Sequence, residues 1–484
     1  KAGSVWSKQK HSRHRTSLHK LLGIGGLSFL LTLSSPFIGY SFPYSPSLQV
    51  FAQSNDAKKA QADRLLEQGI EQFQTSQIEA ALKSFQQALD ISRQIKDRKM
   101  EAGLLGNIGI VYRNLGNYPK AIEYYSQSLK ITQEIKDPTG ESLVLSNLSF
   151  AYNSLGDYPK AIEYSKQSLK IAQEIKNRQN EGMALINLGA AYLNLGNNSK
   201  AIEYLEQSLK IAQETKNRQN EGRAQGNLGI AYKNLGDYSK AINYLEQGLK
   251  IAQEIKSRKE EGDWLNDLGS CYFNMGDYTI AIEYHSQSLK IAQEINNRLG
   301  EGYALNNLGV VYNTSGDYPK AIECFEQSLK IAQEMKNRQG ESESLGNLGT
   351  AYLYLADYDK AIGYHRLSLD IAKKIKDRKL EGNALGNIGS YYLLFEDYPK
   401  AIKYYQQRLE IFQEIKDRQG EGESLGNLGL FYFLLSDYPK AINYQQQSLT
   451  IARDIKDRKR ESESLGNFGL IYSSMGDYPK ALVY

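Results

Sequence analysis

The side chains most able to do chemistry here are two cysteines, Cys271 and Cys324, and two histidines outside the N-terminal segment, His285 and His365. Each stands at a position that neighbouring segments fill with small, apolar or aromatic residues, which indicates packing rather than reactivity. The two histidines lie two repeats apart in a repeating sequence, too far to share one metal ion. We therefore expect buried free thiols, structural histidines, no metal site and no cofactor.

Two further motifs have the composition of catalytic signatures without their spacing. The glycine-rich run at 345–349 lacks the Lys-Ser or Lys-Thr pair of a phosphate-binding loop and falls inside an expected helix. Glu421 and Glu423 are two residues apart and point to different faces of a helix, so a solvated helix start is the simpler interpretation. Because no nucleophile, base and orienting group converge, we predict no catalytic residues and no enzymatic activity.

A row of asparagines is the strongest candidate for a binding function. It occupies one position of a forty-residue repeat, just before a core apolar residue, with Asp267 as the substitute in one repeat. The row comprises Asn107, Asn147, Asn187, Asn227, Asn307, Asn347, Asn387, Asn427 and Asn467. A residue of mediocre helix propensity has no local reason to persist there.

Asparagine offers both a donor and an acceptor, so a ladder of asparagines can pair with the backbone of an extended peptide of any sequence. The alternative is that each asparagine bonds the backbone of a neighbouring helix and holds the array together. We favour contact with a ligand and place the row on a groove.

The residues beside this row become more apolar along the chain. Early repeats place Arg113 near the end of the same helix, whereas later repeats offer Tyr354, Leu394, Leu430 and Leu434. A contiguous exposed apolar patch usually marks a binding surface, although these residues could instead pack beneath a further domain. We add these four apolar residues to the predicted groove.

The elements that must position these residues follow from a strict internal period. A tyrosine recurs every forty residues without insertion or deletion, at Tyr112, Tyr152, Tyr192, Tyr232, Tyr272, Tyr312, Tyr352, Tyr392, Tyr432 and Tyr472. A unit this short cannot bury an apolar face alone, so the fixed period predicts stacked units with one continuous core.

Each unit reads as two amphipathic helices, because apolar residues follow i, i+3, i+4, i+7 spacing in two successive runs. A glycine such as Gly156 ends the first helix, and Asp157 is suited to cap the second. Asp137 is suited to cap the next first helix, with Pro138 at its first position. We expect helices at 138–155 and 158–176.

The spacing of Leu105, Ile108, Gly109, Tyr112 and Ala121 resembles that of the tetratricopeptide repeat (TPR). The forty-residue form is similar to the repeats of Pins-type scaffolds and kinesin light chains. The resemblance covers residues 61–484, as ten full repeats and a truncated eleventh. It implies an all-α TPR solenoid, a right-handed superhelix whose first helices line a peptide-binding groove. Two residues depart from the family pattern, Arg408 and Gln72, and we expect looser packing around them.

The N-terminal segment has a different composition. Residues 1–52 carry six Lys or Arg and no Asp or Glu, and an apolar run at 21–33 is followed by small residues before Gln53. We interpret 1–52 as a signal peptide or an uncleaved membrane anchor, and 53–60 as a linker. We expect export to the periplasm or the cell exterior, with membrane contact only through this segment if it is uncleaved.

The rest of the chain is slightly acidic with both charge signs interleaved, which argues against nucleic acid as a partner. We expect a protein or peptide partner and a scaffold function. The last residues fall inside an expected second helix, and we expect the sequence to be a fragment. Similar arrays resemble those fused to caspase-like CHAT domains, so the alternative function is the sensor arm of a larger hydrolase.

Overall fold

The computed structural model describes residues 46–484 except 76 and 456, with side chains from residue 54 onward. Every element in this part of the chain is an α-helix, and the chain divides into two compact units, the first ending at Ala224 and the second running from Gln225 to Tyr484. The helices of the first unit are α1 (Pro46–Gln74), α2 (Ile78–Gln94), α3 (Arg98–Asn114), α4 (Tyr118–Glu134), α5 (Pro138–Ser154), α6 (Tyr158–Glu174), α7 (Arg178–Asn194) and α8 (Asn198–Glu214).

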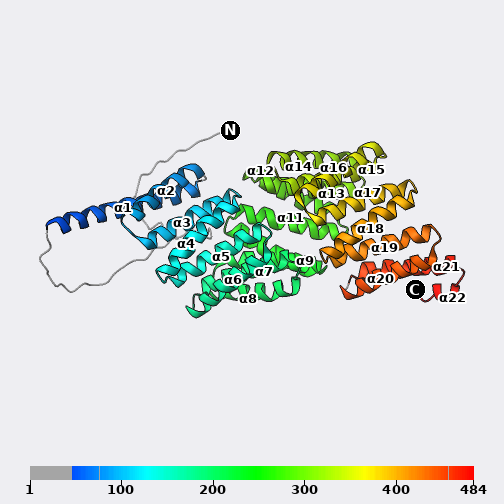
Figure 1. The fold of residues 1–484 in the computed structure, drawn as a ribbon, viewed down its shortest axis with the longest axis horizontal. Coiled ribbons are helices and arrows are strands. Elements are labelled where there is room, and N and C mark those ends of the chain that lie inside the picture. Colours follow the sequence, from blue (N-terminus) through cyan, green and yellow to red (C-terminus); the bar gives the residue numbers. More distant parts are fainter. Residues whose placement is uncertain (1–45, 76, 456) are drawn as a thin grey trace, which may run out of the picture. The chain divides into compact units, whose positions relative to one another are not determined.

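The division falls within α9 (Arg218–Asn234). The helices that follow are α10 (Tyr238–Glu254), α11 (Arg258–Met275), α12 (Tyr278–Glu294), α13 (Arg298–Thr314), α14 (Tyr318–Glu334), α15 (Arg338–Tyr354), α16 (Tyr358–Ile375), α17 (Arg378–Leu394), α18 (Tyr398–Glu414), α19 (Arg418–Leu434), α20 (Tyr438–Asp454), α21 (Arg458–Ser474) and α22 (Tyr478–Ala481). The odd-numbered helices are the first helices of the repeats, and the even-numbered ones are the second helices (Figure 1).

The helix ends are set by local capping, which confirms the expected boundaries to within two residues. The Asp137 carboxylate accepts a hydrogen bond from the Gly140 amide at 3.0 Å at the start of α5, and Asp157 accepts one from the Lys160 amide at 3.2 Å at the start of α6. Gly156 lies between these helices with φ of 80°, a left-handed conformation that glycine adopts without strain. Each repeat is therefore a tight helical hairpin.

Within a hairpin, the close approach of the two helices requires a glycine beneath a large side chain. A Cβ added at Gly309 would lie 2.5 Å from the Phe325 ring of the second helix. One repeat has Ser149 instead, and there the facing residue is the small Ser165, whose hydroxyl lies 2.5 Å from that of Ser149. A larger residue on the first helix is thus matched by a smaller one on the second.

A pair of stacked tyrosines closes the other side of most hairpins. Tyr152 and Tyr164 have ring centroids 5.3 Å apart and nearly parallel planes, and Lys160 lies over the Tyr152 ring at 5.0 Å. Cys324 takes the place of the second tyrosine in its repeat and is half-buried rather than fully buried as we expected. Cys271 is fully buried, and burial raises the pKa of both thiols to about 11.

The first and second helices form two layers. In each unit, first helices pack against their own second helices and also against the next first helix, as α5 does against α7 and α15 against α17. Among the described residues, successive second helices come into much less contact with one another. An array whose one layer is more closely spaced curves toward that layer, so the first helices form the inner side of each unit.

Two expectations need correction, namely the linker at 53–60 and the loose packing around Arg408. Residues 53–60, expected as a linker, are helical and belong to α1. Arg408 is buried rather than loosely packed, because it pairs with Glu423 at 2.8 Å and lies over the Phe412 ring at 4.8 Å. Gln72 accepts a hydrogen bond from Ser84 at 2.7 Å. Most of the expected leader, residues 1–45, lies outside the described residues.

Candidate functional site

The candidate site is the inner face, which we define as the solvent-facing side of the first helices, away from the second helices. This side carries the asparagine row, the apolar residues near the helix ends and the acidic residues Asp267, Glu343 and Glu423. The sequence produces it because the opposite side of each first helix carries the apolar residues and glycines that face the second helix.

In the first unit, asparagines of the row make contacts within the array. Asn187 donates from Nδ2 to the Ser146 backbone carbonyl of the preceding first helix at 2.9 Å. Asn147 is buried and accepts a hydrogen bond from Arg113 at 3.4 Å. Arg113 also lies 5.0 Å above the ring of Phe150, which is exposed on the inner face. An apolar inner-face residue is therefore present in the early repeats, where we expected polar residues.

In the second unit, two asparagines of the row donate to side chains of the preceding first helix instead of to its backbone. Asn307 donates to Asn266 at 3.0 Å, and Asn347 donates to Asn306 at 2.8 Å, each acceptor lying on the preceding first helix. Asn427 instead donates to the Glu423 carbonyl of its own helix at 2.9 Å. The rest of the row, across both units, is half-buried and comprises Asn107, Asn227, Asn387 and Asn467. The alternative, bonding to the backbone of a neighbouring helix, thus occurs at Asn187, whereas Asn307 and Asn347 bond side chains of a neighbouring helix. Peptide binding by the row stays a prediction.

Asp267, which replaces asparagine in one repeat, is matched by a cation. Its carboxylate lies 2.5 Å from the Lys233 ammonium group, and both side chains are largely shielded from solvent. Burial alone would lower the pKa of Lys233, but the attraction of Asp267 outweighs it and the pKa is raised. The site therefore holds a charged pair, which the sequence indicates through the two coincident substitutions.

His285 is buried beside the row rather than poised for chemistry. Its Nδ1 lies 2.9 Å from the Asn266 side-chain oxygen, which also accepts from Asn307. Burial lowers the pKa of His285 and of His365 to about 4, so both rings are neutral at physiological pH. Among the described residues, no group of three or more His, Cys, Asp and Glu side chains could hold a metal ion.

A shallow cavity opens between α13 and α15. It is lined by Leu299 and Tyr303 of α13, Met335 at the end of α14 and Glu343 of α15. Tyr303 is 50% exposed, and partial burial raises the pKa of the Glu343 carboxyl. Sequence reasoning missed Tyr303, although it occupies the inner-face position one helical turn before the asparagine row.

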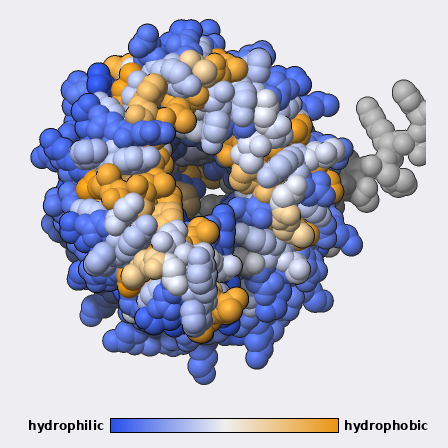
Figure 2. All heavy atoms as spheres, turned by 90° about the vertical axis from the view of Figure 1, so that its right-hand side faces the viewer, coloured by the Kyte–Doolittle hydropathy of each residue, from blue (hydrophilic) through white to orange (hydrophobic). Residues whose placement is uncertain are grey.

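The four apolar residues predicted to line the groove differ in exposure, and their part in binding stays a prediction. Tyr354, Leu394 and Leu434 are 59%, 53% and 42% exposed at the ends of α15, α17 and α19, while Leu430 is half-buried. Tyr354 does not stand alone, because its ring stacks on Tyr318 at 5.4 Å. In Figure 2 apolar residues appear as separate patches between wide hydrophilic areas on the face turned to the viewer.

A partly buried ion-pair network, which the sequence analysis does not predict, is centred on helix α19, which also carries Leu430 and Leu434. Glu423, expected at a solvated helix start, lies 2.8 Å from Arg408 and 3.3 Å from Arg460. Arg408 replaces the serine of most repeats and also donates to Ser424 at 3.1 Å. The usable signal in the sequence was the coincidence of this arginine with an acid one helix later.

No helix among the described residues has the length and apolar character needed to cross a membrane. A search of curated proteins gave no match. Among solved structures, the chain is similar to a Rap protein complexed with Competence and Sporulation Factor, with a TM-score of 0.56 and 15% identity over 74% of this chain and 99% of that chain. It is also similar to the apo form of the quorum sensor NprR from B. thuringiensis, with a TM-score of 0.50 and 13% identity over 70% of this chain and 99% of that one.

A third similar structure is a signal transduction ATPase with numerous domains and a tetratricopeptide repeat sensor, from Pyrococcus horikoshii. Its TM-score is 0.52 with 17% identity, over 70% of this chain and 53% of that chain. At these identities the likeness is one of fold. The expected fusion to a caspase-like domain stays a prediction.

The model of the family described as tetratricopeptide repeat matches residues 100–174, 180–254, 260–334, 340–414 and 421–484. The chain therefore belongs to the tetratricopeptide repeat family.

Proposed function

We propose that this protein is an interaction scaffold that binds an extended peptide or protein segment along the inner face of its second unit. The observation that carries the proposal is the exposure of large apolar side chains on that face, Tyr303, Leu394 and Leu434. Exposed apolar side chains that gather along one side of a protein usually mark an interaction surface.

The polar groups of the same face suit an extended ligand. Glu343 lies beside Tyr303 in the cavity between α13 and α15. The Nδ2 donors of Asn307 and Asn347 are engaged within the array, so we assign affinity chiefly to the apolar residues and leave the asparagines a secondary part. The fold shared with the Rap protein complexed with Competence and Sporulation Factor supports a binding function.

The test compares inner-face and outer-face variants in selection from a random-peptide library displayed on phage. The inner variant combines Tyr303→Ala, Leu394→Ala and Leu434→Ala. The control is Leu367→Ala, which removes a leucine that is 51% exposed on the second helix α16. Each truncated anchor should cost more than about 1 kcal/mol, so the inner variant should bind selected peptides about a hundredfold more weakly in fluorescence anisotropy.

The control should bind as the unaltered chain does. Peptides that bind the inner variant and the unaltered chain equally would contradict the proposal, as would a library from which nothing is retained.

A further inference from the structure

Three departures from the repeat pattern meet at one place in the second unit. Asp359 stands where most repeats have Pro or Ser at the start of the second helix, as at Pro319. Tyr391 stands where most repeats have a small or aliphatic residue, and Phe395 where most have Leu. Asp359 and Tyr391 are far apart in the sequence, yet both line one open cavity of about 590 Å³ between the loop that precedes α16 and the helix α17.

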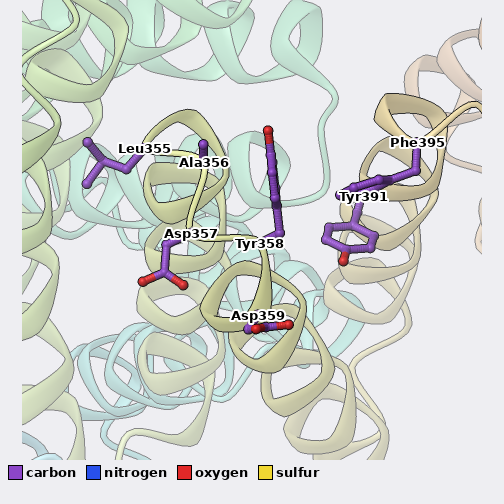
Figure 3. A pocket seen from close by; sticks show the side chains of 7 residues that line it. All are labelled: Leu355, Ala356, Asp357, Tyr358, Asp359, Tyr391 and Phe395. Carbon is purple, nitrogen blue, oxygen red and sulfur yellow. The ribbon is translucent and has the colours of Figure 1, made fainter.

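The walls of this cavity are aromatic. The Phe395 ring lies 4.9 Å from the Tyr358 ring in an edge-to-face arrangement and 4.9 Å from the Tyr391 ring. Figure 3 shows Tyr391 and Phe395 extending from α17 toward Tyr358, with Asp359 below them. Tyr391 is half-buried here, whereas Ala351, Val311 and the equally large Phe431 at the same repeat position are fully buried, so part of the Tyr391 side chain stays open to solvent at the cavity.

The cavity is lined by two carboxylates, Asp357 and Asp359, of which only Asp357 is paired within the described part of the chain. Asp357 caps α16 and pairs with Lys360 at 2.9 Å, and Lys360 in turn lies over the Tyr352 ring at 4.6 Å. Within the described part of the chain, the Asp359 carboxylate has no hydrogen bond or ion pair. Partial burial and the nearby Asp359 raise the pKa of the Tyr391 phenol, while Arg366 acts in the opposite direction.

We propose that Tyr358, Tyr391, Phe395 and Asp359 form an aromatic pocket that binds the cationic side chain of a lysine or arginine of a partner protein. Aromatic faces attract cations through their quadrupoles, and a free carboxylate at the edge adds a charge-assisted hydrogen bond. The pocket opens broadly to solvent, which suits a side chain presented by a protein better than a small free cation. It lies at the turn edge of the repeats and is separate from the inner-face proposal.

The experiment uses saturation-transfer-difference NMR on the whole chain with the peptide acetyl-Gly-Lys-Gly-amide. A neutral peptide with norleucine in place of lysine tests the charge, and tetramethylammonium chloride tests a free cation. The pocket variant combines Asp359→Pro, Tyr391→Ala and Phe395→Leu, each a residue that other repeats carry at that position. A matched control, Phe433→Leu, removes an aromatic contact with Tyr438 in a repeat that has Pro439 instead of an acid.

We expect saturable binding of the lysine peptide that weakens about tenfold or more in the pocket variant and is unchanged in Phe433→Leu. Asp359→Asn, which keeps the shape and removes the charge, should weaken the lysine peptide several-fold and leave the norleucine peptide unaffected. The proposal is overturned if the norleucine peptide binds equally well, if the pocket variant binds like the unaltered chain, or if no saturable binding is found. Tighter binding of tetramethylammonium than of the lysine peptide would also overturn it, by assigning the pocket to a free cation.

Discussion

At the scale of single residues, one position on the second helix accepts very different side chains because a glycine always lies beneath them or a small residue is exchanged for it. Phe325 covers Gly309, His365 covers Gly349, and both larger side chains are about 1% exposed. Gln445 occupies the same position over Gly429. The backbone thus tolerates apolar, aromatic and polar groups there, and the difference between them is electrostatic.

The pH dependence of stability follows from this position. Burial lowers the pKa of His365 to about 4, whereas an exposed histidine in the unfolded chain has a pKa of about 6.5. Below pH 6.5 the unfolded state binds a proton that the folded state does not, so stability is complete above this pH and is lost as the pH falls toward 4. His365→Phe, which copies Phe325, should reduce that loss by about 2–3 kcal/mol in urea unfolding followed at pH 7.5 and pH 4.5.

The matched control is Gln445→Phe, which changes the same repeat position without removing a titrating group. It should shift stability equally at both pH values. An unchanged pH dependence in His365→Phe would show that the ring is protonated in the folded state.

At the scale of the helices, several turns hold a non-glycine residue in the left-handed backbone conformation, which is strained. Nine turns between a second helix and the next first helix place Lys or Asn in the left-handed region, with φ between 53° and 58° among the described residues. Within a repeat the equivalent turn holds a glycine in most cases, but Ser436 has φ of 61°. The left-handed conformation lowers the stability of the folded state for any residue with a Cβ. Nothing in the structure explains the preference for lysine.

Ser436→Gly should therefore raise the free energy of unfolding by about 0.5–1 kcal/mol, because relief of the strain exceeds the added entropy of the unfolded chain. The contrasting substitution is Ser126→Gly on the exposed side of α4, where φ is helical and glycine should lower stability by about 0.5 kcal/mol. Chemical denaturation of the two variants gives the comparison. Equal destabilisation by both would refute the assignment of strain to the turn.

The helices themselves could be read from the sequence because their signals are local. Asp137 and Gly156 act on amides within a few residues, so the cap and the stop are visible without the fold. Residues 53–60 were assigned to a linker because they carry no repeat pattern, although α1 continues through them. Helix propensity was the available signal there, and periodicity was the wrong one.

The partners of the site residues could not be read in the same way. Asn187 and Asn307 occupy the same repeat position, yet one donates to a backbone carbonyl and the other to a side chain. The choice depends on the residue that precedes each by one repeat and one position, Ser146 or Asn266. The aromatic pocket likewise needs Tyr391 next to Asp359, a proximity that only the packing of adjacent repeats provides.

At the scale of the whole molecule, stability is a sum over neighbouring repeats, because within each unit a hairpin packs chiefly on those before and after it. Leu308 lies in the core of α13 and is 4% exposed. Leu308→Ala removes this side chain from the packing between stacked helices and should cost about 2–5 kcal/mol. Because the described helices pack chiefly within their own repeat and against adjacent repeats, that loss stays near the mutated repeat.

Hydrogen exchange read by mass spectrometry would locate the loss. We expect faster exchange in α13 and in the adjoining α14 and α15, unchanged exchange in α3 and α5, and a denaturation curve that separates into two phases. The cause is that the weakened repeat opens first while distant hairpins keep every contact they had. A variant that loses protection evenly in all these helices, with one cooperative transition, would mean that coupling extends across many repeats and that the nearest-neighbour description of this array is wrong.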